Sequence, residues 1–226
     1  MEVFNRMKDK EKWYKDAIEY WQKQDPSVDG MLQGFESISE IDVKGSDEFL
    51  NSLKTKGLLT ATCRRAVDCG AGIGRVSKHF LLKRFEVVDI VEQCENFTNN
   101  INNYMDDVNL SLRIENIYNE GLQTFNPKQN YYDVIWIQWV IGHLTDEDLI
   151  SFIKRCQKGL TNGGCIVIKD NIAARNPVFD QDDSSVTRTH QDFINLFKKA
   201  DATLLYNDIQ KGFPAHLFSV KMYALR

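Results

Sequence analysis

Several features that define special classes of protein are missing from this chain of 226 residues. No run approaches the roughly 18 consecutive apolar residues that a membrane-spanning helix requires, so we expect no membrane partner. The five cysteines are odd in number and form no CxxC pair, which argues against a disulfide framework or a zinc site and favours a reducing compartment. Residues 1–6 lead into a charged segment and are not expected to be a secretory signal.

A strong excess of charge of either sign is also missing. The formal net charge is −4, and a mildly acidic chain lacks the basic footprint of a nucleic-acid binder, so we expect no nucleic-acid partner. Such a chain is better suited to a cationic partner. No repeat or low-complexity tract interrupts it, and 42% hydrophobic residues are typical of a single soluble domain with a substantial core. The oligomeric state stays open.

What the chain does contain is a regular alternation of short apolar runs with helical patterns from Arg64 onward. The strand candidates are residues 66–69, 87–91, 132–140 and 165–169. Such alternation predicts crossover units, and therefore an α/β fold with a mostly parallel sheet covered by helices on both faces. Two further runs, 203–209 and 217–225, flank a segment with glycine and proline and predict an antiparallel hairpin at the sheet edge.

Helices are predicted between these strands. Thr145 opens one with the spacing of a capping box that has Asp148 in place of glutamate, and residues 162–164 (Asn-Gly-Gly) are expected to end it. Thr189 opens a second helix, with apolar residues at helical spacing along one face.

The N-terminal residues differ in pattern. Aromatic residues at helical spacing predict a helix that includes Trp21 and stops before Pro26. Three glycines are expected to break the following segment into a loop: Gly30, Gly34 and Gly45. Another helix is expected over 47–59. We interpret residues 1–60 as a helical extension packed on a core of residues 61–226, the two together forming one domain.

A glycine-rich loop, DCGAGIG at residues 68–74, follows a predicted strand and precedes a predicted helix. Glycines let the backbone turn tightly and approach a ligand without a Cβ clash. In the dinucleotide fingerprint GxGxxG the third glycine comes one residue later than in Gly70-x-Gly72-x-Gly74. The spacing is instead typical of methyltransferases, in which this loop faces the amino-acid end of S-adenosylmethionine. By itself the loop leaves a structural turn or a nucleotide site open.

An acidic residue at a strand end, about 20 positions after such a loop, can accept hydrogen bonds from ribose hydroxyls. Glu92 follows the second strand candidate and is our choice for this role. Asp89 lies within the strand, and we expect it to be structural. Arg75 has two open interpretations, as a bidentate partner for a ligand carboxylate or phosphate, or as an ordinary cation on a helix face.

The run YDVIWIQWVIGHLT at residues 132–145 goes beyond a generic fold. Together with residues 168–171 and 183–186, it resembles the protein N-terminal methyltransferases. That family methylates the α-amino group of proteins that begin Xaa-Pro-Lys or Xaa-Pro-Arg after removal of methionine, and the resemblance extends over nearly the whole chain. It implies a class I methyltransferase fold with a seven-stranded, doubly wound, mostly parallel sheet. It also implies S-adenosyl-L-methionine as cofactor, S-adenosyl-L-homocysteine as product, and a nuclear and cytoplasmic location.

Carried over position by position, the resemblance implies a set of residues around the cofactor. They are Trp21, Gly70, Arg75, Glu92, Gln93, Cys94, Leu122, Gln123 and Gln138. Within this set, Leu122 and Gln123 would flank the adenine, and Trp21 would cover the cofactor from the N-terminal extension.

On the substrate side, the resemblance implies a channel for the Xaa-Pro terminus. Its lining would be Trp139, Asn171, Asp180 and Ser185, with Asp180 placed for the cationic third residue. His143 and Asp183 would form the acid–base pair, because an α-amine with a pKa of about 7.7–8.0 must lose a proton before it can accept a methyl group. Plainer interpretations are a structural histidine, a turn asparagine and a solvated acidic loop. Trp136 is expected to belong to the core.

Four departures from the family pattern concern specificity. They are Gln33, Glu92, the Gln93-Cys94 pair and Phe218. These positions leave the fine substrate preference and the degree of methylation open. Other functions to weigh are a methyltransferase for a small molecule or an internal side chain, an NAD-dependent oxidoreductase, and a non-catalytic methyltransferase-like module. The GxGxG spacing counts against the oxidoreductase, and the presence of His143, Asp183 and Asn171 counts against the non-catalytic module.

Overall fold

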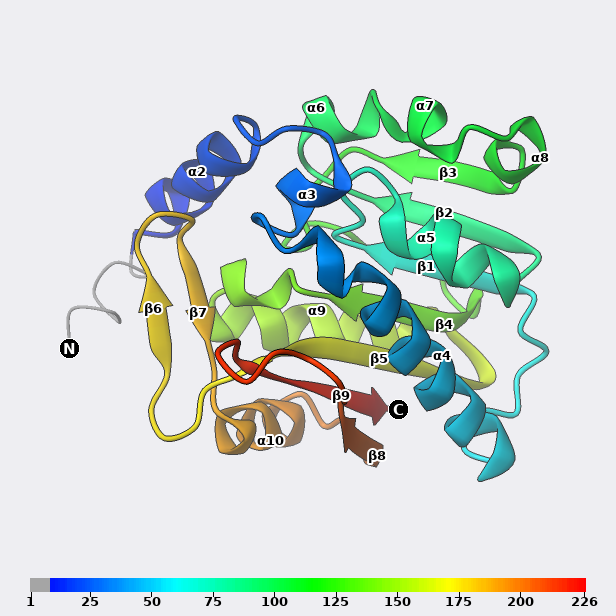
Figure 1. The fold of residues 1–226 in the computed structure, drawn as a ribbon. Helices are drawn as coiled ribbons and strands as arrows, with labels where there is room; N and C mark the ends of the chain where they lie inside the picture. Colours follow the sequence, from blue (N-terminus) through cyan, green and yellow to red (C-terminus); the bar gives the residue numbers. More distant parts are fainter. Residues whose placement is uncertain (1–8) are drawn as a thin grey trace.

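A seven-stranded sheet crosses the molecule, with helices on both of its faces (Figure 1). The structure is a computed structural model that describes residues 9–226, so the expectation about residues 1–6 lies outside the described residues. In spatial order the strands are β3 (Ile114–Tyr118), β2 (Val87–Val91), β1 (Arg65–Cys69), β4 (Tyr132–Gln138), β5 (Leu160–Ile172), β9 (Ser219–Leu225) and β8 (Leu204–Ile209). In the described part of this sheet only β9 runs against its neighbours, so the predicted mostly parallel sheet with a C-terminal antiparallel pair is confirmed.

Helices and one small hairpin complete the fold. The helices are α2 (Lys10–Trp21), α3 (Val28–Met31), η1 (Glu36–Ile38), α4 (Ser39–Thr55), α5 (Arg75–His79), η2 (Leu81–Lys83), α6 (Glu95–Thr98), α7 (Ile101–Met105), α8 (Val108–Ser111), η3 (Ile141–His143), α9 (Asp146–Gly159) and α10 (His190–Lys199). The hairpin consists of β6 (Val178–Asp180) and β7 (Ser185–Thr187), which pair antiparallel apart from the main sheet.

Alternating side chains of the central strand supply two hydrophobic cores. Val134 and Trp136 of β4 pack in the cluster that includes α4 and α5, whereas Ile135 and Ile137 pack in the cluster that includes α9 and α10. Side chains along a strand alternate between the two faces, so a strand that is apolar throughout must be covered on both. Trp136 is therefore a core residue, as predicted. The strand ends at Gln138, two residues earlier than expected.

The helices between the later strands form where they were predicted, with one difference in length. α9 begins where the Thr145 hydroxyl accepts the backbone N–H of Asp148, and the Asp148 carboxylate accepts the Thr145 hydroxyl, so half of the predicted capping box forms. The expected end at 162–164 is wrong, because Leu160 already pairs in the sheet and begins β5. At α10 a full capping box opened by Thr189 is present.

The N-terminal residues are more helical than expected. The predicted helix around Trp21 is present as α2, but it ends at Trp21, short of the expected stop at Asp25-Pro26. α4 begins at Ser39, so the expected loop in this stretch and the expected helix start at residue 47 are wrong. Gly45 lies inside α4, and a Cβ there would come within 2.1 Å of the Gln210 side chain. The glycine therefore lets the helix approach the sheet closely instead of breaking it. Of the helices that the structure describes, none is long and apolar enough to cross a membrane.

Candidate active site

The carboxyl ends of the parallel strands lie at one end of the sheet, together with α2, α3 and the β6–β7 hairpin (Figure 1). Two cavities open there. The first, of about 90 Å³, is called the loop cavity because residues 70–72 line it. The second, of about 420 Å³, is called the hairpin cavity because Asp183 and its neighbours in the hairpin line it. Five residues line both and form a shared wall: Trp21, Met31, Leu32, Trp139 and His143.

The glycine loop turns sharply between β1 and α5. Gly70, Gly72 and Gly74 have φ angles of +73°, +56° and +88°, a region in which a residue with a side chain is strained. A Cβ on Gly70 would lie 2.5 Å from the Cβ of Val140, and one on Gly72 would lie 2.5 Å from the Met31 sulfur. The glycines are therefore required both by the turn and by the close approach of neighbouring segments around the loop cavity.

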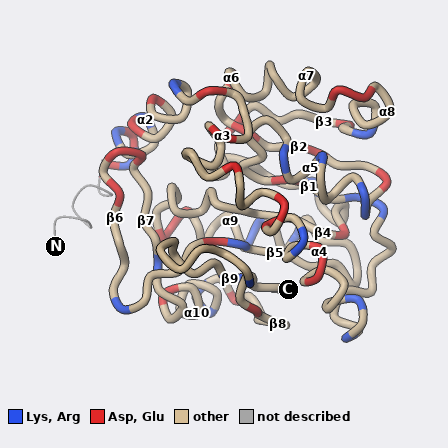
Figure 2. Tube along the Cα trace, viewed as in Figure 1, with Lys and Arg blue, Asp and Glu red and all other residues tan. Residues whose placement is uncertain are grey.

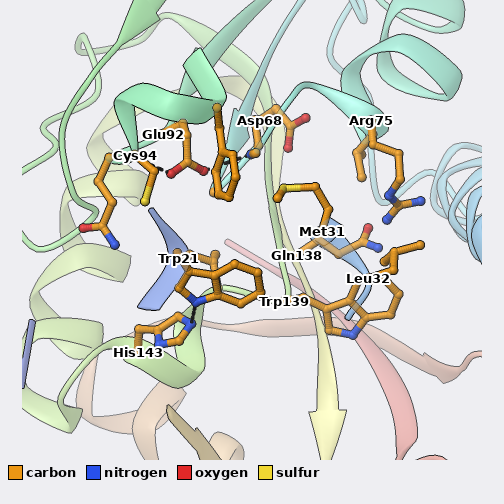
Figure 3. Close-up of a pocket in the computed structure, with 17 residues that line it drawn as sticks. Trp21, Met31, Leu32, Asp68, Arg75, Glu92, Cys94, Gln138, Trp139 and His143 are labelled. Atoms are coloured by element: carbon orange, nitrogen blue, oxygen red, sulfur yellow. Dashed lines mark hydrogen bonds between the residues drawn. The ribbon is translucent and has the colours of Figure 1, made fainter. Parts of the chain in front are cut away.

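Glu92 holds the glycine loop to the end of β2. Its carboxylate accepts the backbone N–H of Gly72 at 2.9 Å and that of Cys94 at 2.9 Å (Figure 3). Burial raises the pKa of Glu92, and these backbone donors act against that rise. Asp89 accepts hydrogen bonds from the Tyr132 hydroxyl and from Asn116 in the interior of the fold, so its predicted structural role is confirmed.

The remaining cofactor residues predicted after β2 lie around the same region. Gln93 and Cys94 line the loop cavity. Leu122 and Gln123 line an adjoining cavity of about 30 Å³, which Gln93 and Glu92 also border. The structure therefore brings these five positions together, although they come from two separate segments of the chain.

Arg75 is buried and is not a cation on a helix surface, so that alternative is wrong. Its guanidinium forms an ion pair with Asp42 of α4 at 2.9 Å and lies 5.6 Å from the centre of the Trp139 ring. Gln138 donates to the same carboxylate at 2.9 Å. Arg75 and Gln138 both face the loop cavity (Figure 3). Asp42 was not predicted, because it lies in the stretch expected to be a loop.

His143 uses both ring nitrogens. Its Nε2 lies 3.0 Å from the indole nitrogen of Trp21 (Figure 3), and its Nδ1 lies 3.1 Å from the carbonyl oxygen of Ser184. An indole N–H can only donate and a carbonyl can only accept, so the imidazole is neutral with its proton on Nδ1. Trp13 donates to the His143 carbonyl at 2.6 Å, which ties the other end of α2 to the same residue. Within residues 9–226 no hydrogen bond joins His143 to Asp183.

Asp183 lies in the turn of the β6–β7 hairpin. Its Oδ1 is buried and finds no hydrogen-bond partner among the described residues. Burial raises the pKa of Asp183. A buried carboxylate oxygen without a donor is unusual, and it indicates a ligand group on the cavity side.

The acidic segment 180–183 forms a hairpin turn in which Asp180 and Asp182 are exposed, as the solvated-loop alternative expects, but Asp183 is buried. Asp180 ends β6, and the turn lies beside α2 (Figure 2). The rings of Phe179 and Trp13 stack at 5.3 Å between their centroids, which holds the hairpin against α2. Asp180 is exposed whereas Asp183 is buried, so the two carboxylates present different environments to a ligand.

Three of the seven non-glycine residues with positive φ in the described chain lie at the hairpin cavity. Trp139, Ser184 and Gln33 have φ angles of +52°, +54° and +49°, and each such conformation costs a residue with a side chain about 1–3 kcal/mol. Trp139 and Gln33 line the cavity, and Ser184 lies between two residues that do. The buried indole nitrogen of Trp139 has no hydrogen-bond partner within the described chain. Strained residues persist where the surroundings hold them, often at binding sites.

The other predicted substrate residues also meet at the hairpin cavity. Asn171 and Ser185 line it, and Phe218 lies at its exposed rim. Asp170 was not predicted, although it precedes Asn171. It lines the same cavity, burial raises its pKa to about 7, and its Oδ2 is unpaired within residues 9–226.

The lining of the loop cavity suits S-adenosylmethionine. Trp21 and Phe97 offer flat apolar surfaces, Glu92 offers a carboxylate for hydroxyl groups, and Arg75 offers a cation for a carboxylate. Each oxygen of Glu92 accepts one of these two backbone hydrogen bonds and retains a second lone pair, and Arg75 has five N–H donors. The glycines leave the space that a side chain would fill. The residues therefore fit this group.

A seven-stranded doubly wound sheet with a glycine loop after β1 and an acid after β2 defines a class I methyltransferase that uses S-adenosylmethionine. A family model described as "AdoMet dependent proline di-methyltransferase" matches residues 9–226. The chain belongs to this family. It is therefore an enzyme that takes its methyl group from S-adenosylmethionine, which sets aside the oxidoreductase and the non-catalytic module.

Individual relatives agree with this assignment. The chain is 44% identical over 223 residues to "Alpha N-terminal protein methyltransferase 1" of Caenorhabditis elegans, covering 98% of this chain and 94% of the relative. It is 42% identical over 220 residues to "N-terminal Xaa-Pro-Lys N-methyltransferase 1" of Danio rerio, covering 97% and 98%. The solved structure of an S-adenosylmethionine-dependent methyltransferase from Leishmania major matches with a TM-score of 0.88 and 34% identity, over 95% of this chain and 83% of that one.

Proposed function

We propose that this enzyme methylates the α-amino group of proteins that begin Xaa-Pro-Lys or Xaa-Pro-Arg once the initiator methionine is removed. Relatives that are more than 40% identical over nearly their whole length carry names that specify Xaa-Pro-Lys N-termini. The observation that carries the proposal is the buried Oδ1 of Asp183, which is unpaired in the described chain. Asp183 lines the hairpin cavity, which shares a wall with the loop cavity.

Asp183 is the proposed base. A protein α-amine has a pKa of about 7.7–8.0 and is mostly protonated at neutral pH, so a proton must leave before the nitrogen lone pair is free. The raised pKa of Asp183 makes its carboxylate a stronger base than a solvated one. S-adenosylmethionine, when bound, supplies an electrophilic methyl group on its sulfonium. The protein holds the amine in place and accepts the proton at an oxygen of Asp183.

His143 is the proposed partner of this base. Its proton on Nδ1 is directed to Ser184, next to Asp183, and its Nε2 is directed to Trp21 in the wall shared by the two cavities. His143 therefore orients the turn that carries Asp183, and it accepts a proton at Nε2 only if Trp21 releases that nitrogen. This refines the predicted acid–base pair into a primary base and a neighbour that fixes its position.

Substrate recognition follows from the different exposure of the acidic residues. The exposed Asp180 suits the side-chain cation of the third residue, which keeps part of its water shell, whereas the buried Asp183 suits the α-amine. The indole of Trp139 offers a flat surface for the proline ring. Asn171 and Ser185 supply polar groups along the same cavity.

Mass spectrometry of a Ser-Pro-Lys peptide incubated with the enzyme and S-adenosylmethionine tests the substrate directly. We expect one or more methyl groups on the α-amine, and the product masses give the degree of methylation. The same peptide with an acetylated N-terminus is the control and should keep its mass. An unmodified free peptide would contradict the proposal, and methylation of the acetylated peptide would favour an internal side chain. We further propose a nuclear and cytoplasmic location, on the family resemblance alone, which microscopy of the tagged protein tests.

A further inference from the structure

A buried polar cluster lies between α4 and the ends of β4 and β5, next to the loop cavity. At its centre the carboxylate of Asp42, which is fully buried, pairs with Arg75 at 2.9 Å. The side-chain amide of Gln138 donates to both oxygens of this carboxylate at 2.9 Å. Asp42 therefore contacts two side chains that line the loop cavity, although it lies in α4 and not in the strands or the glycine loop.

Lys169 holds Asp42 from the other side. Its ammonium group forms an ion pair with the Asp42 carboxylate, and it also donates to the Asp42 carbonyl at 2.8 Å, to the Ser46 hydroxyl at 2.9 Å and to the Gln210 side-chain oxygen at 2.7 Å. These contacts use its three donors, so Lys169 has no capacity left for a ligand. Gln210 in turn donates to the carbonyl of Ile41, and thereby fixes the first turn of α4.

The same cluster reaches the shared wall of the two cavities. The backbone N–H of Trp139 donates to the Lys169 carbonyl at 3.0 Å, and the Trp139 ring lies next to the Arg75 guanidinium. Arg75, Gln138 and Trp139 lie along one side of the loop cavity (Figure 3). The orientation of the side chains on that side of the cavity therefore depends on the carboxylate of Asp42, which α4 supplies.

We propose that Asp42 is a positioning residue for cofactor binding, which sets Arg75 and Gln138 in the loop cavity and is itself held by Lys169 and Gln210. Stability alone does not account for such a cluster, because replacing a buried ion pair by apolar side chains is often neutral or stabilising. What the cluster supplies is a fixed direction for two polar side chains. The inference deepens the proposed function and rests on its cofactor, not on the identity of its peptide.

Calorimetric titration with S-adenosylhomocysteine tests this role without turnover. We expect Asp42→Asn to weaken binding by about tenfold or more, because a hydrogen bond to a charged group contributes about 1.5–3 kcal/mol. The matched control is Asp133→Asn, since Asp133 is also buried and accepts several hydrogen bonds, but lies at the opposite end of β4. Binding by Asp42→Asn within about twofold of wild type, or an equal loss in Asp133→Asn, would overturn the proposal.

A double-mutant cycle separates positioning from stability. If Asp42 acts through Arg75, then Asp42→Asn weakens binding much less in an Arg75→Met background than in the wild type, whereas additive losses contradict the proposal. Should Asp42→Asn fail to fold, Gln210→Leu loosens Lys169 from outside the loop cavity. Its binding should be weaker by about threefold or more, and unchanged binding would overturn the proposal. A wild-type enzyme that binds S-adenosylhomocysteine but leaves the peptide unmodified would refute the substrate alone.

Discussion

The loop cavity and the hairpin cavity share a wall but are built in different ways. The loop cavity is centred on one short segment, the glycine loop, and on the acid at the end of the next strand, and side chains of α2, α3, α5 and the end of β4 complete its wall. The hairpin cavity is assembled from α3, the end of β5, the β6–β7 hairpin and the segment before β9, and it is bordered by non-glycine residues with positive φ. The comparison teaches that the cofactor cavity has a locally encoded centre, the glycine loop, although distant segments such as α4 orient part of its wall, whereas the hairpin cavity depends throughout on the docking of distant segments.

The largest expected effect concerns Asp183 and would separate the two cavities most clearly. Asp183→Asn removes the proposed base but keeps the shape of the turn, so we expect turnover of the peptide to fall by about a hundredfold or more. Affinity for S-adenosylhomocysteine should stay near the wild-type value. Asp182→Asn, an exposed neighbour in the same turn, is the control and should remain active. Equal losses of turnover and of cofactor affinity in Asp183→Asn would remove the distinction between the cavities.

Gly70→Ala should break the loop cavity alone. The added Cβ meets Val140 at 2.5 Å and the backbone has a φ of +73°, so we expect cofactor affinity to fall by about tenfold or more. Gly57→Ala is a matched control, because its φ is +67° but no atom lies within 4 Å of the added Cβ in the described structure. Calorimetry measures both. If the two variants lose the same affinity, backbone strain and not cavity shape is responsible.

Trp21→Phe tests the shared wall. It keeps an aromatic ring but removes the N–H that His143 accepts, so we expect a loss of about two- to tenfold in kcat/KM. Trp13→Phe removes the other hydrogen bond from α2 to His143, at a residue outside the lining of both cavities, and should lower the melting temperature more than kcat/KM. Wild-type kinetics in Trp21→Phe would show that the two cavities are not coupled through His143.

The smallest expected effect is on stability. Burial raises the pKa of Asp170 from an ordinary value of 3.8 to about 7, so folding favours its protonated form. Its contribution to stability is therefore present at low pH and is lost as pH rises through about 7. Asp170→Asn keeps the acceptor for the Asn171 N–H, and should raise the melting temperature at pH 8 by about 2–4 °C. The gain should shrink toward pH 5, and a lower melting temperature at pH 8 would contradict this account.

Much of the fold could be predicted because its signals are local. The predicted apolar runs form strands of the main sheet, and the glycine loop and Glu92 line the loop cavity. Gly45 misled the prediction, since a glycine that breaks an isolated helix can also permit close packing, and only the position of Gln210 distinguishes the two. Asp42 was missed for the same reason, because its partners are far away in the sequence.

By itself the sequence determined the class of fold, because the alternation of apolar runs acts over a few residues at a time, and the spacing of the glycines favoured the cofactor that the family resemblance then implied. The resemblance of residues 132–145 to one family added the substrate. Only the tertiary structure decided how the side chains act together. It joined Trp21 to His143 across 122 positions and left Oδ1 of Asp183 buried and unpaired within residues 9–226. Such contacts depend on how distant segments pack, and no local pattern encodes that packing.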